Sequence, residues 1–183
     1  MGLLGLFGRR RHERAGFALY TAAVRAARDP YYYAELGVPD TLDGRFDMIG
    51  VHVWLLIDRL RRDPPPGPAL AQAVFDAMFS DMDHTLREMG VSDMTVGKRV
   101  KAMWEALHGR SQAYEAAGDE AALTEALGRN VWRGVDPGHA PAVLAGIVQR
   151  QREALADQNL AALAEGKVAF RAAEAVTADA VTT

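Results

Sequence analysis

The sequence contains no cysteine, and this absence excludes disulfide bonds, thiolate metal sites and cysteine nucleophiles. A chain without cysteine fits a reducing compartment, so we expect a cytoplasmic protein. Catalytic signatures are also lacking, because the chain has no glycine-rich phosphate loop, no GxSxG nucleophile elbow and no HExxH zinc motif. We therefore expect no enzymatic activity and no bound cofactor.

An excess of positive charge is missing too. The chain has 21 lysine and arginine residues against 24 aspartate and glutamate residues, which gives a net charge of -3. A protein that binds nucleic acid mainly through the phosphate backbone needs a basic surface. Nucleic acid is therefore not expected as the main ligand.

The apolar run at the N-terminus is short, whereas a bilayer span takes about 20 apolar residues. Residues 1–7 are mostly apolar and the arginines of 9–11 follow them, which is the reverse of the order in a secretory signal. Such a segment can lie in a membrane interface with its arginines toward anionic lipid. We predict a flexible segment over residues 1–14, with two roles left open: a frayed terminus, or a tether that gives peripheral contact with the inner membrane.

Strand patterning is absent as well, since no long stretch alternates apolar and polar residues with period two. Apolar residues recur instead at steps of three and four, and 49% hydrophobic residues in 183 allow a substantial core. We predict an all-α fold: a single-domain helical bundle of six to eight helices over residues 15–170. A disordered tail is predicted over residues 171–183.

Residues 48–57 predict a buried central helix, because His52 is the only ionisable side chain among them. No acid or second histidine shares its helical stripe, so a hydrogen-bonded core histidine is favoured over a metal ligand or proton shuttle. The three tyrosines at 31–33 are expected to pack a connection onto this core.

Residues 72–117 organise the rest of the chain as two helical segments joined at residues 89–92. In the first segment an apolar stripe faces one way, while Asp76, Asp83 and Arg87 lie on a polar line on the other side. Gly90 is typical of the left-handed residue that ends a helix, and a serine or aspartate follows as a cap. A helical hairpin is predicted.

The second segment of the hairpin is expected to be basic on its outer side. Its apolar positions, Trp104 among them, keep helical spacing and are expected to face the core. The basic residues of its exposed side are Lys98, Arg99, Lys101 and Arg110. The hairpin therefore offers one acidic arm and one basic arm.

A cluster of acid and histidine occurs in the first segment. Asp81 and His84 lie three residues apart on one helical face, as a metal-binding pair would. Two ligands do not make a metal site, and a third would have to come from elsewhere, for example His108. A solvated charged face is the favoured interpretation.

Three stretches of the hairpin carry a resemblance to a known family. Residues 79–90 read FSDMDHTLREMG, residues 96–103 read VGKRVKAM, and Gly109-Arg110 is followed by Tyr114. This pattern, which reaches back through residues 45–60, resembles the ubiquinol-cytochrome c chaperone family, and the chain is identified as a bacterial member over roughly residues 15–117. It departs from the family at 107–108, where relatives tend to carry an aromatic pair.

The resemblance implies a non-catalytic assembly chaperone that binds newly made cytochrome b and supports assembly of the ubiquinol-cytochrome c reductase complex. A small partner protein or the ribosome is a further candidate partner. Because the motif coincides with the two charged arms, we assign partner recognition to the hairpin. The candidate partner-binding residues are Asp76, Asp81, Asp83, His84, Arg87, Lys98, Arg99, Lys101, Met103, Arg110 and Tyr114.

A function of another class stays open from the sequence. The chain could instead be a helical-bundle enzyme or a metal-binding protein that uses Asp81, Asp83 and His84. Stoichiometric metal in the purified protein would favour this alternative, whereas binding of an apolar transmembrane peptide would favour the chaperone.

Overall fold

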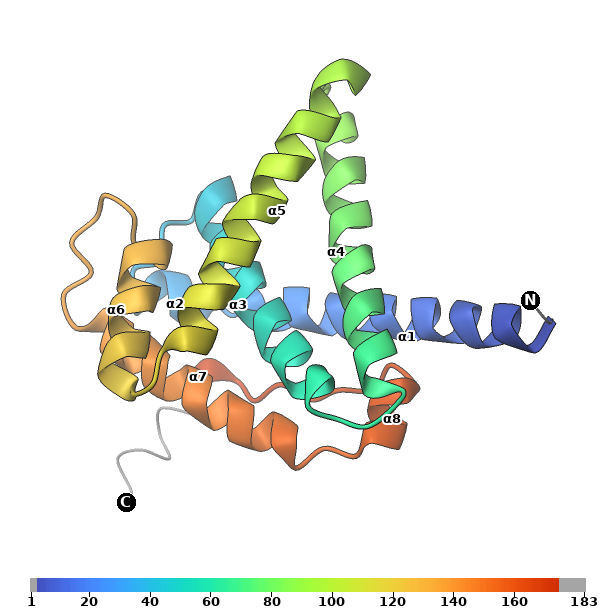
Figure 1. Cartoon of the computed structure of the whole chain (residues 1–183). Helices are drawn as coiled ribbons and strands as arrows, with labels where there is room; N and C mark the ends of the chain where they lie inside the picture. Colours follow the sequence, from blue (N-terminus) through green and yellow to red (C-terminus); the bar gives the residue numbers. More distant parts are fainter. Residues whose placement is uncertain (1–2, 175–183) are drawn as a thin grey trace.

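The computed structural model describes residues 3–174, with side chains from residue 10 onward, and its regular structure is entirely α-helical (Figure 1). None of residues 3–174 lies in a β-strand. The predicted all-α bundle of six to eight helices is confirmed. The helices of the described residues are α1 (Leu3–Ala27), α2 (Pro30–Ala34), α3 (Leu42–Arg61), α4 (Gly67–Glu88), α5 (Asp93–Ala116), α6 (Glu120–Val131), α7 (Ala140–Ala156) and α8 (Leu160–Ala164).

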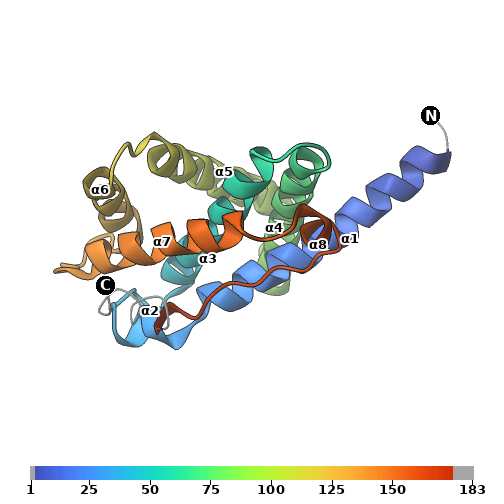
Figure 2. The same ribbon diagram turned by 90° about the horizontal axis from the view of Figure 1, so that it is seen from below.

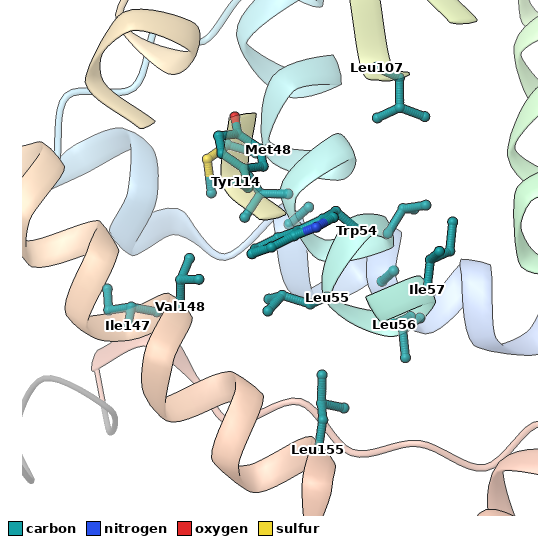
Figure 3. Close-up of a cluster of buried hydrophobic side chains, with 14 of the residues drawn as sticks. Met48, Trp54, Leu55, Leu56, Ile57, Leu107, Tyr114, Ile147, Val148 and Leu155 are labelled. Atoms are coloured by element: carbon teal, nitrogen blue, oxygen red, sulfur yellow. The ribbon is translucent and has the colours of Figure 1, made fainter. Parts of the chain in front are cut away.

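Helix α3 is the centre of the fold, as the apolar run predicts. Residues 47–60 are all buried except Ile49 and Arg59, which are half-buried. The helix begins after Thr41, whose hydroxyl accepts a hydrogen bond from the Gly44 amide at 3.1 Å. Helices α1, α4, α5, α6 and α7 all contact α3, and Figure 3 shows side chains of α5 and α7 around it. An apolar helix of this kind requires such cover on every side.

Helix α1 lies against α4 and extends past the rest of the molecule at its N-terminal end (Figures 1 and 2). The helix begins at Leu3, so Gly16 lies inside it. It serves close packing, because a Cβ atom at Gly16 would lie only 2.5 Å from Ala73 of α4.

The three tyrosines pack onto the core, as predicted, but they form the short helix α2 and not an open connection. The Asp29 carboxylate accepts a hydrogen bond from the Tyr31 amide at 3.0 Å and so caps this helix. Tyr32 is buried, and the Tyr33 hydroxyl donates to the Ala27 carbonyl at 2.9 Å. The turn between α1 and α2 is held by these contacts.

Two arginines add polar contacts between α7 and α3. Arg152 binds the Asp58 carboxylate at 3.2 Å, and its guanidinium lies 4.8 Å from the ring centre of Trp54. Arg59 of α3 donates in the opposite direction, to the Leu155 carbonyl of α7 at 2.9 Å. That carbonyl belongs to the last turn of α7, where backbone acceptors have no partner within the helix.

The chain after α8 runs back along α1 toward α2 (Figure 2). The Gln151 side chain donates to the Arg171 carbonyl at 2.7 Å and accepts from the Arg171 amide at 3.1 Å. The Ala173 amide donates to the Asp29 carboxylate at 3.1 Å. An extended segment is thus held in place by hydrogen bonds to α7 and to the start of α2.

The two ends of the chain are described only in part. The apolar residues of the predicted tether, 3–7, are described by their helical backbone alone. Of the predicted disordered tail, 171–183, the residues from 175 on lie outside the described part. Between residues 3 and 174, no helix is both long enough and apolar enough to cross a membrane.

His52 is a hydrogen-bonded core residue, as predicted. Its Nδ1 lies 2.9 Å from the Met48 carbonyl, and its Nε2 lies 3.3 Å from the Tyr32 hydroxyl. The carbonyl can only accept, so Nδ1 carries the proton and Nε2 accepts from the tyrosine. Phe170 packs edge-on against the imidazole at 5.4 Å between ring centres. Burial lowers the pKa of His52 to about 4.

We expect Leu56→Ala to lower the free energy of unfolding by about 2–5 kcal/mol, because Leu56 is fully buried in α3 and truncation leaves a cavity. Chemical denaturation measures the change. Leu42→Ala is the matched control, because Leu42 belongs to the same helix and is 67% exposed. Equal losses in the two variants would contradict the central position of α3.

We also expect His52 to make the protein less stable in acid. Its pKa is about 4 in the folded chain, below the ordinary value of 6.5. Between pH 6.5 and pH 4, His52 is therefore protonated in the unfolded chain but remains neutral in the folded chain. The free energy of unfolding falls progressively over this pH range. The full effect is about 3 kcal/mol.

Unfolding free energies at pH 7 and pH 4.5 measure this loss in the parent and in His52→Gln. The loss should be smaller in the variant, because glutamine has no proton to gain. The same pH dependence in both proteins would show that His52 does not contribute to it.

Candidate functional site

Helices α4 and α5 form the predicted hairpin. Gly90 is in the left-handed region with φ 80°, and Ser92 occupies the N-cap position of α5. Figure 1 shows the two arms meeting at this turn and diverging toward α3, which lies across their open end. The hairpin therefore projects from the body of the protein with its turn as the apex.

Arg87 ties the two arms together at the apex. Its Nε lies 2.6 Å from the Asp83 carboxylate, and its guanidinium also pairs with Asp93 at the start of α5. The hydrogen bond from Arg87 holds the pKa of Asp83 below its usual range. Met89 and Met94 beside this pair are exposed, Met94 to 92%. The apex thus combines paired charges with uncovered apolar side chains.

The acidic arm is only partly free. Asp76 is exposed and accepts a hydrogen bond from the Gln72 side chain at 2.7 Å. Asp81 accepts one from the Tyr20 hydroxyl of α1 at 2.7 Å. Desolvation, reinforced by this hydrogen bond, raises the pKa of Tyr20. Both aspartates are exposed, but Asp81 joins α4 to α1, whereas the hydrogen bond of Asp76 lies within α4.

The two histidines considered for a metal site have other neighbours. His84 Nε2 lies 3.2 Å from the Glu88 carboxylate on the same helix. His108 stacks on Trp104 of α5, with ring centres 5.1 Å apart and planes 7° apart. In the part of the chain that the structure describes, no three histidine, aspartate or glutamate side chains form a group that could hold a metal ion.

The basic arm is exposed at three of the four predicted positions. Lys98, Arg99 and Lys101 are all exposed. Lys101 forms an ion pair with Glu105 one turn further along, with 3.7 Å between the charged atoms. Such exposed pairs are weak, so the lysine remains available to a partner.

The prediction that Arg110 belongs to this exposed basic side is wrong. Its side chain is 11% exposed and pairs with the buried carboxylate of Asp47 on α3. Arg133, from the connection after α6, binds the other oxygen of Asp47 at 2.7 Å. A buried carboxylate is very unfavourable without such partners, so Asp47 holds Arg110 in the interior. The sequence does contain a signal for this pairing: Asp47 stands directly before the apolar run of α3, where a carboxylate becomes buried and needs a cationic partner.

Tyr114 and Met103 also hold α5 against the core. Tyr114 is buried, and its ring centre lies 5.1 Å from that of Trp54. Met103 is half-buried and packs on the same core. The other charged candidates are therefore exposed or half-buried on the two arms, whereas Arg110 and Tyr114 face the core.

Each arm of the hairpin carries a pair of stacked or packed rings. Trp104, which the sequence places on the core side, is 39% exposed and lies on His108. On α4, the half-buried rings of Phe75 and Phe79 pack together with 4.6 Å between their centres. The divergence of the arms leaves these groups incompletely covered.

A cleft of about 50 Å³ lies between the arms where they reach α3. Four residues of α3 line it, together with Phe75 of α4 and five residues of α5. The α3 residues are Val53, Trp54, Ile57 and Arg61, and the α5 residues are Leu107, His108, Ser111, Gln112 and Glu115. The sequence could not reveal this cleft, because its walls come from three helices whose angles depend on tertiary packing.

A second, open groove of about 500 Å³ lies between α1 and α8. Arg10, Arg11 and Arg14 line it on α1, and Glu165 lines it after α8. Phe17, one of the exposed large apolar residues, lies on the same stretch of α1 as these arginines. This part of α1 thus presents a basic surface with an aromatic side chain beside it.

Comparisons with known proteins agree over most of the chain. The family model described as "Ubiquinol-cytochrome C chaperone" matches residues 34–170, which include α3 and both arms of the hairpin. The crystal structure of the Cbp3 homolog from Brucella abortus is similar with a TM-score of 0.80 and 36% identity, over 94% of this chain and 98% of that one.

Two relatives carry the name ubiquinol-cytochrome c reductase complex assembly factor 1. The protein of Xenopus laevis is 24% identical over 119 residues, which are 64% of this chain and 60% of the relative. The human protein is 24% identical over 149 residues, 79% of this chain and 50% of the relative. The chain thus spans 50–60% of the length of these two relatives.

Proposed function

The chain belongs to the ubiquinol-cytochrome c chaperone family, and from this premise we propose that it is a non-catalytic chaperone that binds newly made cytochrome b and supports assembly of ubiquinol-cytochrome c reductase. The observation that carries the proposal is the family match over residues 34–170, because it contains the whole projecting hairpin and the helix on which the hairpin rests. The names of the relatives point to assembly of the same complex.

The surface of the hairpin suits protein recognition. Asp76 lies exposed on one arm, Lys98 and Lys101 lie exposed on the other, and Met94 is uncovered at the apex. Exposed charges contribute only about 0–1 kcal/mol each to stability, whereas charges at an interface steer encounter and select the partner. Methionine adapts its shape to varied apolar surfaces. A membrane-protein client presents such apolar surfaces before it is inserted.

We also infer that the N-terminal part of α1 contacts the membrane in which the client is inserted. Arg10, Arg11 and Arg14 form a basic surface beside the exposed Phe17, and the N-terminal end of the helix extends past the body (Figure 2). Basic residues bind anionic lipid headgroups with about 1 kcal/mol each. The interaction would be peripheral.

Reversing the two lysines to Lys98→Glu and Lys101→Glu should leave the protein folded but abolish recovery of cytochrome b in an affinity pulldown from native membranes. Asp83→Lys should also abolish recovery of cytochrome b, because it replaces the partner of Arg87 with a second positive charge. The cell should then lose quinol:cytochrome c reductase activity. Thermal melts check that folding is retained.

The matched control for the double reversal is Arg25→Glu with Arg129→Glu, which changes the net charge equally at exposed positions on α1 and α6. This control should recover cytochrome b like the parent. If the hairpin variants melt and recover cytochrome b at parental levels, the hairpin charges do not bind the client.

Deleting residues 1–11 should leave the melting temperature nearly unchanged and reduce sedimentation with anionic vesicles. Arg10→Gln, Arg11→Gln and Arg14→Gln together should reduce vesicle binding roughly a hundredfold, from about 1 kcal/mol per arginine. The difference from the parent should shrink as salt rises. Equal vesicle binding by the parent and both variants would remove the membrane contact from the proposal.

A further inference from the structure

Three arginines of α1 line the open groove between α1 and α8. Arg10, Arg11 and Arg14 are all exposed, and among the residues that the structure describes none of their side chains forms an ion pair or a hydrogen bond. Arg10 and Arg14 are one helical turn apart, so they lie on the same face of α1. A guanidinium group can bind a phosphate with two parallel hydrogen bonds. The groove therefore offers three cationic donors to an anion.

The acidic residue of the groove already has a partner within the chain. Glu165 follows α8, and the Lys167 ammonium lies 2.8 Å from its carboxylate. The hydrogen bond from Lys167 and the charges of Lys167 and Arg11 lower the pKa of Glu165. Glu13 of α1 lines the neighbouring hollow and not this groove. The groove thus keeps a surplus of positive charge beside its carboxylate.

The two walls of the groove are held close together. A Cβ atom at Gly166, directly after α8, would lie 2.7 Å from the Cβ of Ala18 on α1, so a larger residue would push the walls apart. Figure 2 shows α8 lying against α1. Ala15 and Ala164 complete the lining, and their short side chains leave room for a ligand. The volume of about 500 Å³ is within the roughly 300–1,000 Å³ of small-molecule sites, so the groove is large enough for a phospholipid headgroup.

Apolar groups beside the groove indicate the source of the phosphate. Phe17 is 59% exposed and lies one turn after Arg14, on the face of α1 that also carries Arg10. The apolar residues 3–7 belong to the same helix. Free phosphate gains nothing from apolar neighbours, whereas a phospholipid presents its phosphate next to its acyl chains. The arrangement therefore favours a phosphate that belongs to a lipid.

We propose that Arg10, Arg11 and Arg14 form a binding site for the phosphate group of an anionic phospholipid, with Phe17 against the start of its acyl chains. The proposal rests on the membrane contact proposed above and makes it specific, because the arginines bind the headgroup through paired hydrogen bonds and not only through their charge. Lysine is attracted to an anionic membrane as strongly as arginine, but its ammonium lacks the planar pair of donors. Replacement of arginine by lysine therefore separates a phosphate site from diffuse attraction.

Sedimentation with mixed vesicles of phosphatidylglycerol and phosphatidylcholine measures this difference. Arg11→Lys with Arg14→Lys should weaken vesicle binding by roughly tenfold at unchanged net charge, which corresponds to the loss of one charge-assisted hydrogen bond. The matched control is Arg25→Lys with Arg129→Lys, which makes the same exchange at exposed positions outside the groove and should bind like the parent. Thermal melts check that both double variants are folded.

Glycerophosphoglycerol, which is the phosphatidylglycerol headgroup without acyl chains, tests the groove in solution by nuclear magnetic resonance. The backbone amide signals of Ala15 and Ala164 should shift saturably in the parent and less in the groove variant. Inorganic phosphate is the second probe. If it shifts the same signals while vesicles bind the groove variant like the parent, the groove takes free phosphate and the lipid is overturned as its ligand.

The outcomes separate this inference from the proposals on which it rests. If the parent and the groove variant bind the vesicles equally well, the attraction is diffuse, so the phosphate site is overturned and the membrane contact stands. If glycerophosphoglycerol leaves the signals of Ala15 and Ala164 in place, the phosphate site is likewise overturned. If the parent does not bind the vesicles, the membrane contact fails together with its lipid ligand. Recovery of cytochrome b tests the assembly role separately from all three results.

Discussion

The burial of α3 on every side is the constraint on which the rest of the structure depends. A helix with almost no polar face has to be covered from all directions, and each covering helix approaches it differently. Helix α5 comes close at Gly50, where a Cβ would lie 3.1 Å from Leu107. Trp54 is held between Tyr114 of α5 and Arg152 of α7. The position of the projecting hairpin therefore follows from how α3 is covered.

The features that the sequence predicted well are those that local chemistry determines. The apolar run of α3 requires burial wherever it lies, and Gly90 allows the left-handed turn that joins α4 to α5. Helical spacing likewise predicted the arms and the exposed positions of Lys98 and Lys101. In each case neighbouring residues along the chain carry the information.

The features that the sequence missed depend on contacts between distant segments. Arginine is usually a surface residue, but Arg110 is buried because it pairs with the buried carboxylate of Asp47, which lies 63 positions earlier in the chain. Trp104 keeps the spacing of the core stripe, yet the divergence of the arms leaves it partly exposed. Gly16 is a packing position opposite Ala73, a role that depends on a helix more than 50 residues away along the chain. The cleft belongs to this class, since no single helix contains it.

Helix α5 has two different tasks on its two sides. Its inner side supplies Tyr114 and Arg110, which determine where the helix lies. Its outer side supplies Lys98 and Lys101, which make no contact that the fold depends on. The cleft lies at the border, where Leu107 belongs to the core and His108 to the rim. The residues that position this helix can therefore vary independently of the lysines that we propose as client contacts.

The hydrogen bond from Ala173 to Asp29 has a consequence for the order of events during synthesis. It joins residues 144 positions apart, and Phe170, from the same returning segment, covers His52. Chains emerge from the ribosome with the N-terminal part first. Tyr32 can pack on His52 early, but the face of the imidazole that Phe170 covers stays open until the segment around residue 170 has been made, so this part of the core closes late in synthesis.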